Sequence, residues 1–143
     1  LQTFRRYTSA YSTLRPQALA ANASQDFSHT VLPSSLLIPS RDLEPFKLHA
    51  SVIFSIFDSF EMIPELGPNG VHFSPETDTV IAHCKMGGKI NGKSESGAKL
   101  VKQGLSEWWT ECVLFVKMDR TGREVVEVRE FVHSAKAEEL KKR

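Results

Sequence analysis

The most informative run of the sequence is Glu107-Trp108-Trp109-Thr110-Glu111-Cys112-Val113-Leu114-Phe115-Val116, which the turn Asp119-Arg120-Thr121-Gly122 joins to a second run from Glu124 to His133. Both runs are rich in the β-branched and aromatic residues that favour strands. A short turn that contains glycine between two such runs is typical of a β-hairpin. This part of the chain is therefore predicted to form two neighbouring antiparallel strands.

The second strand of this hairpin carries one carboxylate on an apolar face. Because side chains alternate between the two faces of a strand, one face consists of Val126, Val128, Glu130 and Val132. A carboxylate that faces a core is costly unless it is paired, protonated or opens into a polar cavity. Glu130 therefore predicts an interior pocket.

Length and composition predict a single domain over residues 1–143. Hydrophobic residues make up 41% of the chain, and a chain of this size can bury roughly two thirds of its unfolded surface. The net charge of +1 comes with scattered basic residues, so no nucleic-acid partner is expected. No run of 18 apolar residues is present, so no membrane association is expected either. Cys84 and Cys112 lie within apolar strand patterns and predict reduced core thiols in a cytoplasmic protein.

The first half of the chain is predicted to be helical. Apolar residues at spacings of three and four, strong helix formers and N-cap residues mark the expected helices. These helices cover Leu1–Leu14, Pro16–Ala21, Ser24–Val31 and, after the cap residue Asp42, residues 43–59.

The last of these helices carries His49 on its apolar stripe, between Phe46 and Ile53. One interpretation is a core histidine that is hydrogen-bonded to a backbone carbonyl. The other is that His49 meets Glu130 across one cavity, as a base facing an acid. Both interpretations stay open at this point.

The second half of the chain is rich in predicted strands. Residues 60–73 contain two prolines and predict an interrupted strand, and residues 79–86 predict a regular one. The polar stretch Lys89–Gly104 indicates an irregular surface loop or a mobile flap. Ser134–Arg143 predicts a C-terminal helix. Helices followed by strands are typical of an α+β fold in which helices cover one face of a curved antiparallel sheet.

Both faces of the strand from Trp108 to Met118 are apolar. A large apolar patch on the surface of a small domain usually marks an interface. We therefore expect a homodimer that forms through the outer face of the sheet.

Several of these segments together resemble a known family. They are Pro33-Ser34-Ser35 before a capped helix with Phe46 and His49, the strand Trp109–Phe115, the turn with Gly122, and Glu130-Phe131-Val132-His133-Ser134-Ala135. In this order they resemble the small fungal branch of the nuclear transport factor 2-like, or SnoaL-like, proteins. The resemblance implies a cone-shaped α+β barrel in which a bent sheet wraps around the N-terminal helices and leaves a central pocket.

The resemblance also implies a function. Several members of that branch act as cofactor-independent isomerases, cyclases or dehydratases on polyketide, terpenoid or alkaloid intermediates, whereas others have no known activity. By position, the pocket residues of the family correspond here to Glu130 and Arg41. This sequence has His133 where relatives often have Asp, and Cys112 where they often have an aromatic residue.

We therefore predict an acid–base enzyme that acts on a polycyclic, hydrophobic secondary metabolite. The sequence contains no G-x-G-x-x-G, P-loop or metal-ligand cluster, so neither a cofactor nor a metal is expected. The expected catalytic residues are Glu130, His49 and Arg41, and the expected substrate contacts are Phe46, Ile53, Phe57, His83, Trp108 and Cys112. The alternative is a non-catalytic binding or dimerisation module of the same fold. The choice between isomerisation, cyclisation and dehydration stays open.

Overall fold

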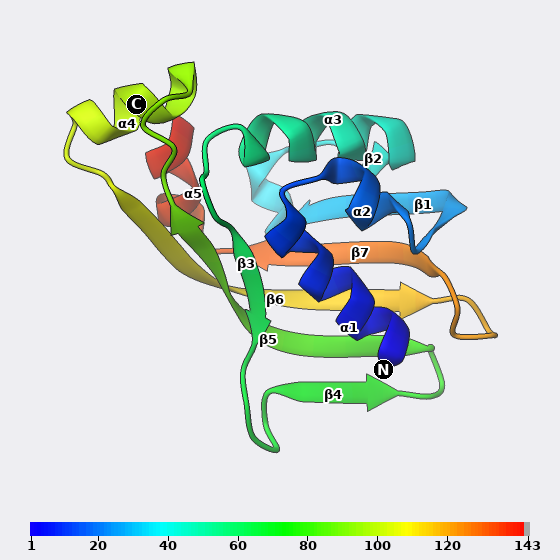
Figure 1. Ribbon diagram of the computed structural model, residues 1–143. Helices are drawn as coiled ribbons and strands as arrows, with labels where there is room; N and C mark the ends of the chain where they lie inside the picture. The colour runs from blue at the N-terminus through cyan, green and yellow to red at the C-terminus, as the bar shows by residue number, and fades with distance from the viewer. Residues whose placement is uncertain (142–143) are drawn as a thin grey trace.

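A computed structural model describes residues 1–141 of the chain. Its elements, in chain order, are α1 (Gln2–Ser9), the 3-10 helix η1 (Ala10–Thr13), α2 (Pro16–Ala20), β1 (Ala23–Leu32), the 3-10 helix η2 (Ser34–Leu36), β2 (Arg41–Asp42), α3 (Leu43–Phe54), β3 (Glu61–Pro64), β4 (Val71–Ser74), β5 (Thr79–Lys89), α4 (Glu95–Lys102), β6 (Glu107–Met118), β7 (Val125–Val132) and α5 (Ser134–Lys141). Figure 1 shows α1, α2 and α3 on one face of the sheet.

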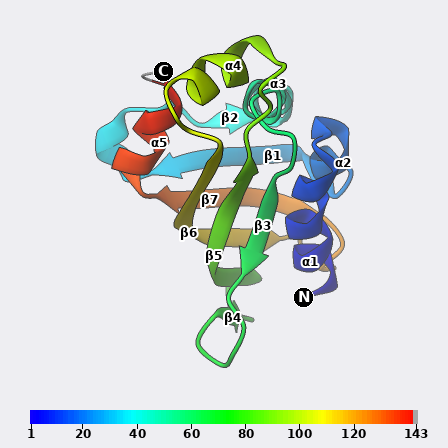
Figure 2. The same ribbon diagram turned by 60° about the vertical axis from the view of Figure 1, so that its left-hand side comes forward.

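The strands form one bent, mixed sheet in the order β2-β1-β7-β6-β5-β3, with β4 also paired to β5. In Figure 2, β3, β5 and β6 run steeply across β1 and β7, so the sheet curls around the helices. The predicted α+β class with a curved sheet is confirmed. The prediction of a wholly antiparallel sheet is wrong at one pair, because β1 and β7 run parallel.

The hairpin predicted from residues 107–133 is confirmed as β6 and β7. These strands are antiparallel, and Leu114 lies directly opposite Glu130. An irregularity in the register between Lys117 and Met118 shifts the start of β7 by one residue. As a result, Val125 is buried on the inner face. Strict alternation predicts Val126 at this place.

The segment predicted as a short helix over Ser24–Val31 is instead the strand β1. Ser24 and Asp26 look like helix-capping residues, but Phe27 and His29 are buried while Asp26 is exposed, which is the period of a strand. The second half of the segment, from Ser28 on, pairs with β7, so the backbone hydrogen bonds of this part go to a distant strand. Tertiary pairing here overrides the local capping signal.

Two other boundaries differ from the prediction. The helix expected to reach Ser59 ends at Phe54, because the backbone of Ile56 and Asp58 bonds to residues 89 and 91 instead. Part of the polar stretch 89–104, expected to be irregular, forms α4, whose N-cap Ser94 accepts a hydrogen bond from the Gly97 N–H at 3.0 Å. The glycine in the first turn hides this helix in the sequence.

The remaining predictions of elements agree with the structure. The helix expected over residues 1–14 is present as α1 followed by η1, and the interrupted strand over residues 60–73 is present as β3 and β4. The C-terminal helix is present as α5, and the last two residues predicted for it lie outside the described residues. Within the described residues, no helix combines the length and the apolar character needed to cross a bilayer.

Candidate active site

A cavity of about 430 Å³ lies between the inner face of the sheet and the helices α3 and α5. Most of its lining is apolar, and this part includes Phe46, Ile53 and Trp108. The polar groups that line it gather mainly on β1, β2 and β7, where His29, Arg41 and Glu130 are found. An apolar cavity with a few converging polar groups is the usual form of a small-molecule site.

Glu130 and His29 form a buried pair in this cavity. The Glu130 side chain comes from the inner face of β7 and the His29 side chain from β1, and the two residues are 8% and 3% exposed. His29 Nε2 lies 3.3 Å from Glu130 Oε1, at hydrogen-bond distance. His29 thus holds one carboxylate oxygen of Glu130 at the wall of the cavity.

His29 is fixed in position by an aromatic neighbour. The ring of Phe46, from α3, packs on the imidazole with centroids 4.8 Å apart and on Phe27 with centroids 4.9 Å apart. His29 Nδ1 is buried, and no described residue forms a hydrogen bond with it. The pair therefore has a buried imidazole nitrogen that no described residue satisfies.

Arg41 extends this polar group along the sheet. It lies directly opposite His29 in the antiparallel pairing of β2 with β1, so both side chains share one face of the sheet. The Arg41 Nη1 atom is buried and has no hydrogen-bond partner among the described residues. Burial lowers the pKa of the Arg41 guanidinium, and the negative charge of Glu130 opposes this effect.

Two tyrosines lie close to the carboxylate. The Tyr11 side chain lines the cavity, and its hydroxyl is 2.8 Å from the hydroxyl of Tyr7. Burial raises the pKa of both phenols well above the ordinary value, and the charge of Glu130 contributes to the rise. Both hydroxyls are therefore neutral donors at ordinary pH.

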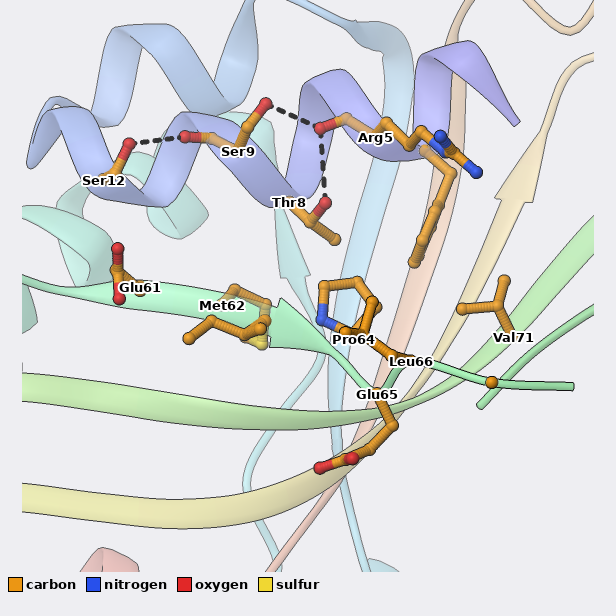
Figure 3. A pocket seen from close by; sticks show the side chains of 13 residues that line it. Arg5, Thr8, Ser9, Ser12, Glu61, Met62, Pro64, Glu65, Leu66 and Val71 are labelled. Carbon is orange, nitrogen blue, oxygen red and sulfur yellow. Dashed lines mark hydrogen bonds between the residues drawn. The ribbon is translucent and has the colours of Figure 1, made fainter. Parts of the chain in front are cut away.

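A second, larger hollow of about 670 Å³ lies between α1 and β3 (Figure 3). The hydroxyls of Thr8 and Ser9 on its wall bond to the carbonyl of Arg5 in the same helix. Among the described residues, no histidine or cysteine lines it. Its hydroxyls are thus engaged with backbone carbonyls, whereas the cavity with Glu130 joins a carboxylate, an imidazole and a guanidinium. The cavity with Glu130 is the stronger candidate for a site.

Comparison with known proteins identifies the fold. No family model matches the sequence, and no curated protein does. Among solved structures, BvnE pinacolase from Penicillium brevicompactum superposes with a TM-score of 0.80 at 13% identity, over 99% of this chain and 87% of that one. AusH from Aspergillus nidulans has a TM-score of 0.77 at 18% identity, over 93% and 82%.

A SnoaL-like protein from a Jannaschia species, a candidate polyketide cyclase, superposes with a TM-score of 0.67 at 14% identity, over 96% of this chain and 87% of that one. This protein has the SnoaL-like, or nuclear transport factor 2-like, fold. At such identities the likeness concerns the fold alone, so the chemistry has to be argued from the residues of the pocket.

Several of the predicted site residues line the cavity that contains Glu130. Glu130, Arg41, Phe46, Ile53, Trp108 and also His49 are part of its wall. His49 reaches it from α3 and is partly exposed, and its contact with Glu130 stays a prediction. A second imidazole, that of His29 from β1, is in hydrogen-bond contact with Glu130.

Three predicted substrate contacts lie elsewhere. His83 is on the outer face of β5, where it pairs with Glu111 at 3.7 Å, because strand alternation turns it away from the buried Cys84. Phe57 is buried behind the pocket wall, with its ring centroid 6.1 Å from that of Trp108. Cys112 is buried against Met62, with the two sulfur atoms 3.7 Å apart.

The two thiols are core residues, as predicted. Cys84 and Cys112 are buried, free and directly opposite each other on β5 and β6. A hydrogen bond with Cys84 and burial raise the pKa of the Cys112 thiol. A thiol of this kind stays protonated and is a poor nucleophile.

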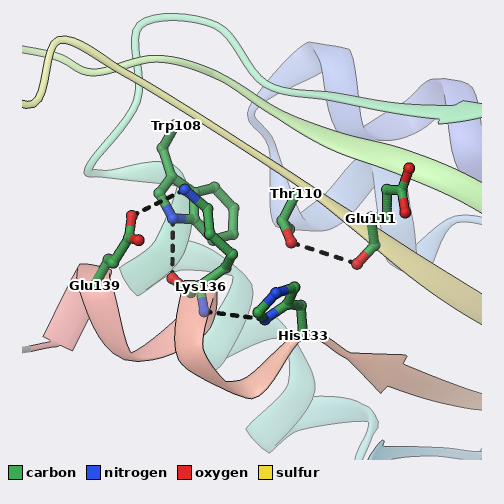
Figure 4. Close-up of polar contacts among 6 residues, drawn as sticks. All are labelled: Trp108, Thr110, Glu111, His133, Lys136 and Glu139. Carbon is green, nitrogen blue, oxygen red and sulfur yellow. Dashed lines mark hydrogen bonds and ion pairs between the residues drawn. The ribbon is translucent and has the colours of Figure 1, made fainter.

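The C-terminal helix α5 closes one side of the cavity that contains Glu130. Ser134, Ala137 and Leu140 from this helix line the cavity. Trp108 Nε1 donates a hydrogen bond of 3.0 Å to the carbonyl oxygen of Lys136, which anchors the helix over the end of β6 (Figure 4). The pocket is therefore bounded by elements from both ends of the chain.

Among the polar residues of the pocket, the sequence analysis missed His29, Tyr11, Ser134 and Glu138. His29 was hidden because its segment was interpreted as a helix. The signal that could have identified it is the pair Phe27 and His29, two residues apart, which share a face in a strand but not in a helix.

Proposed function

We propose that the protein is a cofactor-independent acid–base enzyme, an isomerase, cyclase or dehydratase, that acts on a polycyclic and largely apolar metabolite. The observation that carries the proposal is the buried pair of Glu130 and His29, with 3.3 Å between Oε1 and Nε2, on the wall of an apolar cavity. Among proteins of the same fold, one is named a pinacolase and another a candidate polyketide cyclase, which supports an enzyme.

In the proposed mechanism Glu130 moves a proton to or from a carbon or oxygen atom of the bound metabolite. His29 holds the carboxylate in one orientation and exchanges the proton with it between turnovers. Arg41 and the Tyr11 hydroxyl face the same cavity and stabilise negative charge that develops on a substrate oxygen. His49 lines the cavity and acts as a second proton carrier in this scheme.

The apolar wall explains why a carboxylate serves this role. Phe46, Ile53 and Trp108 exclude water from the substrate rings and give a ring system a large contact area. In such surroundings a proton acceptor faces less competition from solvent. A binding module has no use for a carboxylate on this wall, because a carboxylate is costly to bury.

Substitution of Glu130 tests the proposal. Glu130→Gln keeps the shape and a hydrogen bond to His29, so the fold should persist, but it removes proton transfer and should lower turnover by about 100- to 10,000-fold. Extracts of the host with its own gene deleted, and then supplied with the wild-type or the variant gene, are compared by mass spectrometry. The metabolite that accumulates without the gene should persist with Glu130→Gln and disappear with the wild type.

The matched control is Glu76→Gln, which makes the same chemical change at an exposed turn and should behave as the wild type. Full conversion of the metabolite by the Glu130→Gln variant would exclude the acid–base mechanism and favour a non-catalytic binding module.

We also propose that the protein forms a homodimer through the outer face of the sheet. Phe131 on this face is 48% exposed, and Arg129 stacks on the ring of Phe115 at 4.7 Å. Sedimentation should give twice the chain mass of 16.0 kDa. Phe131→Glu should give the monomer, because a charge is costly to bury at the interface.

Phe73→Glu is the control for the dimer. Phe73 is 50% exposed, but it is the cross-strand partner of the inward-facing Val80 and therefore does not lie on the outer face. A monomeric wild type, or a dimer that survives Phe131→Glu, would contradict the proposal.

A further inference from the structure

Glu130 and Arg41, two charged residues that line the cavity, differ in whether they have a charged partner. Glu130 has His29 as a partner, whereas Arg41 forms no ion pair with any residue in the described range 1–141. The Nη1 atom of Arg41 is buried, and nothing in the described protein satisfies it. A buried guanidinium nitrogen without an acceptor is costly, and a ligand that supplies the acceptor would account for it.

The backbone of Arg41 is fixed beside the cavity. Its strand β2 pairs with β1 through the register His29 to Arg41. The hydroxyls of Thr30 and Ser40 are 2.7 Å apart and tie the approach to β2 onto β1. A ligand that binds the guanidinium therefore has to order the side chain but not the strand.

The chemistry of guanidinium limits what this ligand can be. Arginine binds planar oxyanions through two parallel hydrogen bonds, and these charge-assisted bonds are about twice as strong as neutral ones. The carboxylate of Glu130 is two strands away, at roughly 10 Å between backbones from the spacing of neighbouring strands. It is near enough to lower the cost of burying Arg41, and the His29 contact takes up one of its oxygens.

The other charged group on the wall is Glu138, on α5. An acidic group on the ligand would be repelled by Glu138 and Glu130 and attracted by Arg41. Its favourable position is therefore beside Arg41. The carbon next to that position then lies toward His29 and Glu130, since His29 is directly opposite Arg41 and is in contact with Glu130.

We infer that the substrate carries one ionised oxygen group, a carboxylate or an acidic enolate, which binds Arg41 while an apolar ring system fills the rest of the cavity. This inference rests on the proposed function and adds the charge of the ligand and its orientation. The reacting carbon is expected beside the anionic group, within reach of Glu130.

Two fluorescent probes of matched shape test the inference by equilibrium binding. Anilinonaphthalene sulfonate has two aromatic units and an anionic group, and N-phenylnaphthylamine has the same rings without the charge. The wild-type protein should bind the anionic probe at least about tenfold more tightly than the neutral one, as expected for a charge-assisted hydrogen bond. Arg41→Gln should remove this preference and leave the affinity for the neutral probe unchanged.

Two controls define the site. Arg123→Gln removes an exposed arginine and should keep the preference. Ala137→Trp fills the cavity from α5 and should abolish binding of both probes. Circular dichroism verifies the fold of each variant, and Arg41→Met replaces Arg41→Gln if the latter does not fold.

Equal affinity of the wild type for the two probes, a preference that survives loss of Arg41, or binding that survives Ala137→Trp would overturn the inference. So would a protein that binds neither probe. Since probe binding needs no turnover, these results are independent of the Glu130→Gln experiment. An unselective cavity combined with loss of turnover in Glu130→Gln would reject the anionic substrate and retain the acid–base enzyme.

Discussion

Above pH 10 the free energy of unfolding should fall by about 2.7 kcal/mol per pH unit, owing to Tyr7 and Tyr11 alone. These are the two tyrosines of the chain, and burial raises the pKa of both in the folded state. In the unfolded chain each phenol loses its proton near pH 10. The folded state then binds more protons than the unfolded state, so stability is complete below pH 10 and is lost as the pH rises above it.

Urea denaturation at several pH values between 9 and about 11.5 measures this effect. The double variant Tyr7→Phe/Tyr11→Phe is the control, because its pH dependence contains the lysines and cysteines but not the phenols. The difference between the two slopes isolates the tyrosines. Tyrosinate absorbance that rises near pH 10 while the protein remains folded would contradict the prediction, since it would mean that the phenols are open to solvent.

The expected alkaline loss has a bearing on the site. The Tyr11 side chain lines the cavity, and its hydroxyl, which is in contact with that of Tyr7, stays protonated as long as the protein is folded. Its titration therefore does not affect the proposed activity below pH 10, and a fall in that activity must come from other groups.

The part of the site that could be predicted from the sequence is the part that depends on local pattern. Glu130 is the single acidic residue on the apolar face of its strand. The strand is recognisable because a turn joins it to its neighbour in the chain. The buried position of Glu130 follows from the alternation of side chains along the strand. The same alternation places His83 and Cys84 on different faces, so the position of His83 on the outer face could also be predicted from the sequence.

The part that could not be predicted depends on contacts between distant segments. The strand state of β1 arises from parallel pairing with β7, about a hundred residues later, and its one local signal in Ser24–Val31 is the two-residue spacing of Phe27 and His29. Without that pairing His29 has no defined face. Arg41 was identified by the family resemblance, and its unsatisfied donor is visible only once β2 is placed beside β1.

Loss of either member of the buried pair should inactivate the enzyme, and loss of both should cost no more than loss of Glu130. Glu130→Gln should lower turnover about 100- to 10,000-fold and His29→Phe at least about tenfold. His29→Phe keeps an aromatic ring against Phe46 but removes the group that orients the carboxylate. Groups that act as one unit have non-additive effects, so the double variant should match Glu130→Gln within about threefold.

The matched control is the exposed pair of the same residue types, His83 and Glu111, at 3.7 Å on the outer face. His83→Phe, Glu111→Gln and their double variant should all keep wild-type turnover, because this pair lies outside the cavity. Purified variants are assayed with the metabolite that accumulates in the gene deletion, and denaturation is measured in parallel. Additive losses in the His29 and Glu130 cycle would show that the two residues work independently, and the imidazole would then be a packing partner of Phe46 and not part of the proton-transfer pair.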